Sequence, residues 1–167
     1  MNFIVAVDEN FGIGKNGDLL FHIKKDMAFF RETTMNKVVV MGKNTLLSFP
    51  GGKPLKNRVN IVLSSKGDFD SQGATVCKNT QELFETLKNY KSEDIFVIGG
   101  AKVYGLLAPY CEKAYITKIC AVGDGDTFID NIDFDENWEL EESSEVFSEN
   151  GIDFTFNTYI NKNIKKF

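Results

Sequence analysis

The chain has 167 residues, 43% of them hydrophobic and 13% aromatic, which is enough to form the core of one domain. Its net charge of −5 argues against a nucleic-acid or anionic-membrane partner. No apolar stretch approaches the roughly 20 residues of a membrane span, and no N-terminal signal pattern is present. We therefore expect one domain over residues 1–167, monomeric and cytoplasmic.

Short apolar runs alternate with helical patterns along the chain. In chain order we expect a strand at 3–8, a helix at 24–33, a strand at 37–42, a helix at 44–48, strands at 59–64 and 74–78, a helix at 80–89, a strand at 94–99, a helix at 101–108, and strands at 114–121, 138–143 and 153–160. The early alternation predicts a parallel sheet covered on both faces, and the helix-free last third predicts an antiparallel edge. The expected fold is three-layer α/β, with a mixed, mostly parallel, eight-stranded sheet and about four helices.

Smaller features complete this outline. Thr80 is expected to cap the helix that follows it, and residues 162–167 are expected to form a solvated end. Cys77, Cys111 and Cys120 have no metal-ligand spacing, and His22 is the single histidine. We expect reduced, buried thiols and no metal. If the protein is an enzyme, a bound cofactor is therefore expected to carry the difficult chemistry.

One carboxylate falls on an apolar helical face. Asp26 lies on the same side of its predicted helix as Ile23, Phe29, Phe30 and Thr33. Two interpretations remain open from spacing alone. Asp26 could be a surface residue near the positive end of the helix dipole, or a polar anchor for a ligand in an apolar pocket.

Three glycine-bearing segments are candidate phosphate sites. The run Gly12-Ile-Gly14-Lys-Asn-Gly17 matches a dinucleotide fingerprint in spacing, but its helical pattern begins only near Lys24, so we reject it. In contrast, Gly99-Gly100 and Gly42 each follow an apolar strand and directly precede a predicted helix. Two helix starts with exposed amides suit a pyrophosphate with a further phosphate nearby.

The whole chain, in order, resembles dihydrofolate reductase of the bacterial type. The resemblance is carried by Ile4-Val-Ala6, Gly12-Ile-Gly14, Asp26 with Phe29-Phe30, Val40-Met-Gly-Lys-Asn-Thr45, Pro54-Leu55 with Arg58, Asn60-Ile-Val-Leu-Ser-Ser65, Val97-Ile-Gly-Gly100 with Val103-Tyr104, Tyr115-Ile-Thr117 and Gly125-Asp-Thr127. It implies NADPH-dependent reduction of dihydrofolate to tetrahydrofolate, which supplies one-carbon metabolism. Residues 38–90 would form an adenosine-binding subdomain.

The resemblance also implies roles for individual residues. Asp26 would accept two parallel hydrogen bonds from the pterin, Thr117 would bond the same carboxylate, and Arg58 would bind the α-carboxylate of the glutamate tail. Catalytic residues would be Asp26, Thr117 and Tyr104. Substrate-binding residues would be Ile4, Val5, Ala6, Leu19, Asp26, Met27, Phe30, Arg58 and Ile98. NADPH-binding residues would be Ala6, Ile13, Gly14, Gly42, Lys43, Asn44, Thr45, Leu63, Ser64, Ser65, Gly99, Gly100, Ala101, Lys102, Val103, Tyr104 and Asp126.

The chain departs from the family pattern at Leu20-Phe21, where the family usually has Pro-Trp, and Phe21 cannot donate the hydrogen bond of a Trp. Gly125-Asp126 matches the loop that braces the segment around Leu19, so closure of residues 8–23 is expected to gate turnover. Two alternatives stay open: another NADPH-dependent pterin or pyrimidine reductase on this fold, and a pterin-binding protein without catalysis.

Overall fold

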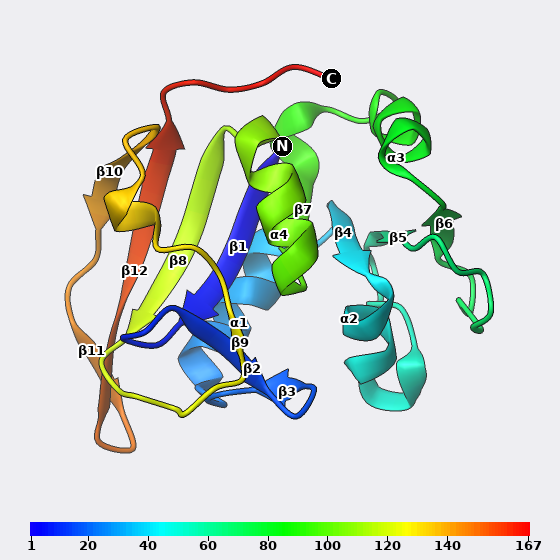
Figure 1. The fold of residues 1–167 in the computed structure, drawn as a ribbon. Helices are drawn as coiled ribbons and strands as arrows, with labels where there is room; N and C mark the ends of the chain where they lie inside the picture. Colours follow the sequence, from blue (N-terminus) through cyan, green and yellow to red (C-terminus); the bar gives the residue numbers. More distant parts are fainter.

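The computed structural model describes residues 1–167, and its central sheet has the strand order β10-β12-β8-β1-β7-β4-β5-β6, with β11 paired to β12 (Figure 1). Its strands are β1 (Asn2–Val7), β4 (Val38–Gly42), β5 (Val59–Leu63), β6 (Thr75–Cys77), β7 (Ile95–Gly99), β8 (Lys113–Ile119), β10 (Trp138–Ser143), β11 (Phe147–Glu149) and β12 (Ile152–Asn161). The α-helices are α1 (Lys24–Thr34), α2 (Lys43–Ser48), α3 (Thr80–Leu87) and α4 (Ala101–Leu107). Single 3-10 turns lie at Pro50–Gly52, Ser92–Asp94, Ala108–Tyr110 and Ile132–Phe134. All eight predicted strands and four predicted helices are therefore present.

The sheet is parallel over most of its width and antiparallel at one edge. From β8 to β6 every neighbouring pair is parallel, whereas β12 is antiparallel to β8, β10 and β11. Helices lie in the segments that lead from β1 to β4, from β4 to β5, from β6 to β7 and from β7 to β8, whereas β5 and β6 are joined by a loop without a helix. The antiparallel pairs are formed by strands of the last third of the chain, which has no α-helix. The predicted mixed sheet with an antiparallel edge is confirmed.

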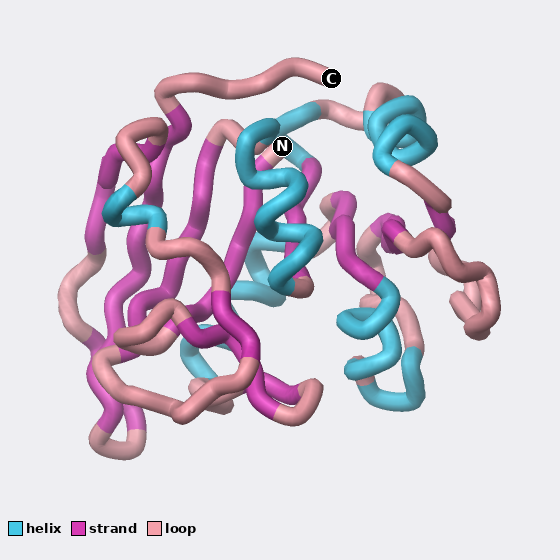
Figure 2. The backbone as a smooth tube through the Cα atoms, viewed as in Figure 1, coloured by secondary structure: helices cyan, strands magenta, loops and turns pink.

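The two faces of the sheet are covered by different helices. Phe3, Val5 and Val7 point to the face where Val103 and Leu107 of α4 complete the main core. On the other face Leu46 of α2 packs with Val39 and Met41, and Phe29 of α1 contacts Phe156 with ring centroids 4.6 Å apart. Strand side chains alternate between faces, so this arrangement makes three layers (Figure 2).

A ninth strand and a small second sheet were not predicted. β11 pairs with β12, and β2 (Gly12–Lys15) lies between β3 (Asp18–Leu19) and β9 (Thr127–Phe128) in a separate antiparallel sheet. These strands are two to four residues long, so their sequences show no alternation. Pairing with partners distant in the chain, rather than local pattern, produces them.

Three smaller predictions were wrong. Asn79, not Thr80, caps α3, because its side chain accepts the N–H of Glu82. The C-terminal end is not simply solvated, since the ring of Phe167 stacks on Phe84 with centroids 4.6 Å apart. Of the three free thiols, Cys77 and Cys111 are buried but Cys120 is exposed. No helix is both long and apolar enough to span a membrane.

Candidate active site

Asp26 lies in the first turn of α1 and faces the central sheet. Thr117 of β8 donates a hydrogen bond of 2.6 Å from its Oγ1 to Asp26 Oδ1, and Asp26 Oδ2 has no partner within the chain. In the register of the sheet Thr117 pairs with Ala6 of β1. Lys24 and Lys25 are exposed, whereas Ile23 is buried and Phe29, Phe30 and Thr33 are half-buried, so the predicted helical face is confirmed.

The surroundings of Asp26 make its charged form costly. Burial raises the pKa of the Asp26 carboxyl above its ordinary value, and the hydrogen bond from Thr117 opposes that rise. No cation of the protein is paired with it. A ligand that donates two hydrogen bonds, or that becomes cationic, would therefore stabilise the carboxylate.

The N-terminus of α1, the helix that carries Asp26, is capped by a residue that the sequence did not predict. Ile23 offers no capping side chain, and the Glu149 carboxylate of β11 instead accepts the N–H groups of Lys24 (2.8 Å) and Lys25 (3.3 Å). A carboxylate at a helix N-terminus also favours the helix dipole. Because Glu149 is more than 120 residues away in the chain, no local pattern could have indicated this cap.

Tyr104 connects α4 to β1 through the sheet. Its hydroxyl donates a 2.8 Å hydrogen bond to the backbone carbonyl of Ile4, and the side chain is buried. Burial, with a smaller contribution from the charge of Asp26, raises the pKa of Tyr104. The Tyr104 hydroxyl is therefore protonated and hydrogen-bonded to the backbone of β1 in this structure.

The apolar residues predicted to line a substrate pocket separate into two groups. Ile4 is buried, Ala6, Phe30 and Ile98 are half-buried, and Leu19 and Met27 are 54% and 50% exposed. Val5 instead packs into the main core beside α4, because its side chain points to the opposite face from Ile4 and Ala6. On the α1 face, only the backbone of Val5 can contact a ligand. The prediction that the Val5 side chain forms part of the pocket wall was therefore wrong.

Arg58 is held at the C-terminal end of α1. Its guanidinium donates to Thr34 Oγ1 (3.2 Å from both Nε and Nη2), to the Arg31 carbonyl (3.1 Å) and to the Lys56 carbonyl (2.7 Å). Burial, and then the positive charge of Arg31, lowers the pKa of the Arg58 guanidinium. An anion bound at this position would relieve both effects, and its geometry would be set by a guanidinium that the protein already orients.

The ends of β4 and β7 meet at a corner formed by glycines. A Cβ on Gly99 would lie 3.0 Å from Thr45 Oγ1, and one on Gly42 would lie 3.2 Å from Val103 Cγ2. Gly99 also has φ +142°, and it is joined to Gly100 by a cis peptide bond. The corner brings together the starts of α2 and α4, as predicted, and its missing side chains allow a ligand to approach the backbone closely.

The predicted phosphate-binding side chains differ in their exposure and in their partners within the protein. Lys43 Nζ lies 3.2 Å from Asp68 Oδ1, and the Ser64 hydroxyl donates to the Lys66 carbonyl. Ser65 and Lys102 are exposed, as is Asn44, while Leu63 is half-buried. The expected positive patch is therefore reduced at Lys43 by an acidic neighbour, which only the tertiary structure reveals.

The rejected fingerprint forms part of the small sheet. Gly12 and Gly14 belong to β2, not to the start of a helix. Asp126 donates its N–H to the Gly14 carbonyl (3.0 Å), and its Oδ2 accepts the N–H of Asn16 (2.9 Å), which lowers the pKa of Asp126. Asp126 is thus bonded to the 8–23 segment at Gly14 and Asn16, with Ile13 half-buried beside Gly14, whereas the predicted role of this loop in closure around Leu19 stays a prediction.

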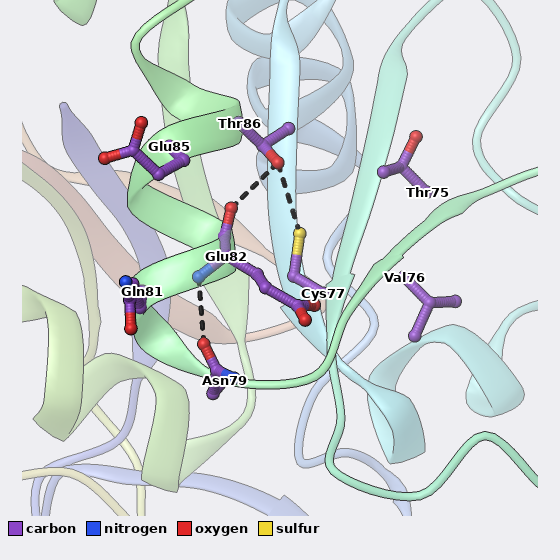
Figure 3. A pocket seen from close by; sticks show the side chains of 8 residues that line it. All are labelled: Thr75, Val76, Cys77, Asn79, Gln81, Glu82, Glu85 and Thr86. Carbon is purple, nitrogen blue, oxygen red and sulfur yellow. Dashed lines mark hydrogen bonds between the residues drawn. The ribbon is translucent and has the colours of Figure 1, made fainter.

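One pocket lies away from the predicted site residues. This pocket, of about 550 Å³, lies between β6 and α3 and is lined by Thr75, Val76, Cys77, Asn79, Gln81, Glu82, Glu85 and Thr86 (Figure 3). Its lining includes two glutamates and no basic residue. None of the predicted site residues lines it, so size alone does not locate the site.

The fold and the site together define an α/β protein whose candidate site lies at the carboxyl ends of parallel strands, near Ala6, Gly42 and Gly99, which is where open α/β sheets commonly bind ligands. The family model described as dihydrofolate reductase matches residues 1–161. The chain is 37% identical to dihydrofolate reductase of Bacillus subtilis, over 99% of this chain and 97% of that protein. It is 38% identical to that of Drosophila melanogaster, over 93% and 94%.

A solved structure is also similar. Dihydrofolate reductase from Enterococcus faecalis, complexed with NADP(H) and RAB-propyl, superposes with a TM-score of 0.85 at 32% identity, covering 96% of this chain and 95% of that one. The chain belongs to the dihydrofolate reductase family.

Proposed function

We propose that this protein reduces 7,8-dihydrofolate to 5,6,7,8-tetrahydrofolate with NADPH, with hydride delivered to C6 and a proton to N5. The observation that carries the proposal is the half-buried Asp26 carboxylate, bonded by Thr117 on one oxygen and free of any protein partner on the other. A pterin edge presents a ring N–H beside an amino group, and a carboxylate accepts both. Family membership supports the same reaction.

Different residues of the chain bind and orient dihydrofolate. Asp26 orients the ring and responds to its protonation, while Ile4, Ala6 and Phe30 offer apolar contact on the same face. Thr117 fixes the Asp26 carboxylate. Arg58, already oriented by Thr34, binds the carboxylate of the glutamate tail. Asp26 need not donate the proton itself, since water beside it can supply N5.

The glycine corner fits NADPH. A side chain at Gly99 would meet Thr45, so the empty space beside the backbone depends on glycine at this position. When bound, NADPH supplies the hydride. Gly42, Gly99 and Gly100 allow close approach of its phosphates, and Thr45, Ser64, Ser65 and Lys43 offer hydroxyl and cationic contacts. The segment at residues 38–90, which holds several of these groups, is proposed as the adenosine-binding part. The relative from Enterococcus faecalis, which is complexed with NADP(H), supports NADPH as the cofactor.

We further propose that the protein works as a monomer in the cytoplasm. All the predicted site residues come from one chain, and its three cysteines are free thiols, which suits a reducing compartment. Analytical ultracentrifugation at assay concentration tests the first point. Fractionation of the producing cells tests the second.

One assay decides the function. NADPH absorbance is followed with and without dihydrofolate, and oxidation that depends on dihydrofolate is the expected result. Oxidation that requires a different pterin or pyrimidine would favour another reductase on this fold. Tight folate binding without NADPH oxidation would favour a non-catalytic pterin-binding protein, for which the Phe21 substitution is the supporting observation.

A further inference from the structure

A second buried carboxylate, Asp8, joins two loops beside the proposed site. Asp8 directly follows β1 and is only 3% exposed. Its Oδ1 accepts the N–H groups of Asn10 (2.9 Å) and Gly12 (2.8 Å), whereas its Oδ2 accepts the N–H of Gly123 (2.9 Å). Asn10 and Gly12 begin the chain segment between β1 and α1, and Gly123 lies between β8 and β9. One side chain therefore connects segments that are 115 residues apart.

Two of the three amides bonded to Asp8 belong to glycines that lie next to Leu20. A Cβ on Gly12 would lie 3.0 Å from Leu20 Cδ1, one on Gly123 would lie 3.1 Å from Leu20 Cβ, and one on Gly125 would lie 3.2 Å from Leu20 Cδ1. We call these three glycines the Leu20 socket. Two of its three walls, Gly12 and Gly123, are bonded to Asp8. The position of the socket therefore depends on this carboxylate.

Leu20 lies four residues before α1, the helix that carries Asp26. Phe21, the next residue, packs against the buried cluster of Ile23, Ile119 and Phe154, to which Ala6 also packs. The chain then enters α1, whose first turn contains Asp26. The segment 9–23 is thus bonded to Asp8 at its start and continues into the Asp26 helix at its end. Displacement of Leu20 from the socket would therefore shift the segment that leads into the Asp26 helix.

We propose that Asp8 is a positioning residue for hydride transfer, and that its bond to Gly123 keeps Leu20 in the socket and the 9–23 segment in its closed position. The Asp8–Gly123 hydrogen bond is separate from the hydrogen bonds that join Asp126 to Gly14 and Asn16 further along the segment. The inference rests on the proposed reductase function. A misplaced enclosing segment costs rate even when it is remote from the reacting atoms.

The substitution Asp8→Asn tests the Asp8–Gly123 hydrogen bond selectively. An asparagine carbonyl can still accept from Asn10 and Gly12, but its NH₂ group would face the N–H of Gly123, so the bond between the loops is the one that breaks. Asp124→Asn is the matched control, because Asp124 is exposed, adjoins Gly123, makes no side-chain hydrogen bond and loses the same charge. Its positive φ of 51° is also one that asparagine adopts.

The measurement is single-turnover hydride transfer with NADPH and with its deuterated form. We expect Asp8→Asn to slow hydride transfer by about 10- to 100-fold. The isotope effect on kcat should rise, because hydride transfer becomes rate-limiting. The Kd for NADPH should change by less than about twofold if only loop position is affected. Asp124→Asn should match wild type in all three quantities.

A wild-type hydride rate in folded Asp8→Asn overturns the proposal, even if the melting temperature falls. If Asp8→Asn does not fold, Leu20→Ala takes its place, because it keeps every bond of Asp8 and empties the socket. Leu20→Ala should slow hydride transfer in the same way, and an unchanged rate again overturns the proposal. Failure of the proposed function is seen separately, as wild-type protein that does not oxidise NADPH with dihydrofolate.

Discussion

Thr117 Oγ1 donates to Asp26 Oδ1 over 2.6 Å and so connects β8 to the first turn of α1. The bond opposes, without cancelling, the increase in the pKa of Asp26 that burial causes. The protein therefore contains a carboxylate whose charge it stabilises only in part. Such a group costs folding free energy when ionised and becomes favourable when a ligand bonds to it.

Asp26→Asn should lose activity and gain stability. The raised pKa means that the folded state binds the Asp26 proton more tightly than the unfolded state, so ionisation destabilises the fold. This cost is absent below the ordinary pKa of 3.8 and is established as pH rises through the folded pKa. We expect kcat/KM to fall at least about 100-fold. The melting temperature should exceed that of wild type at neutral pH, by a margin that shrinks near pH 4. A variant with full activity would contradict the role of Asp26.

Thr117→Val should move the pH dependence rather than abolish activity. Valine has the same shape but donates no hydrogen bond, so the pKa of Asp26 should rise further. The limb of the kcat/KM profile that reports Asp26 should then shift to higher pH. Thr158→Val on β12 is a suitable control, because Thr158 is half-buried and makes no side-chain hydrogen bond. An identical profile for both variants would show that the Thr117 bond does not tune Asp26.

Arg58→Lys should weaken dihydrofolate binding and leave NADPH binding unchanged. Lysine cannot reproduce a guanidinium that bonds Thr34 and the Arg31 carbonyl while facing a carboxylate. We expect the KM for dihydrofolate to rise about 10-fold, corresponding to the loss of one charge-assisted contact. The same substitution should have little effect on the KM for dihydropteroate, which lacks the glutamate. Equal losses with both substrates would place Arg58 outside the tail site.

Gly99→Ala should damage both stability and NADPH binding. The added methyl group would lie 3.0 Å from Thr45 Oγ1 at a residue with φ +142°. Forcing a side chain into this backbone region costs about 1–3 kcal/mol. Gly105→Ala is the matched control, because Gly105 lies in α4 with open space around it. That change should stabilise the protein by about 0.5–1 kcal/mol. Chemical denaturation and NADPH titration of both variants make the comparison.

Much of the fold could be predicted from the sequence because its signals are local. Eight of the nine strands of the main sheet lie within apolar or alternating runs of the sequence, and α1 shows a helical period that places Asp26 beside Phe29 and Phe30. The strands that escaped prediction, β2, β3, β9 and β11, are too short to show any period. They form because their backbone groups find partners far away in the chain.

The same distinction between local signals and contacts of distant segments applies to the site. By itself the sequence determined the types of residue, the glycine-bearing strand ends, and the ordered motifs that resemble one family. It could not determine that Asp68 pairs with Lys43, that Glu149 caps α1, or that Asp8 bonds Gly123. Each of these depends on two segments meeting in space, and a hydrogen bond or ion pair has no sequence period. Only the tertiary structure decides which distant groups come within 3 Å of one another.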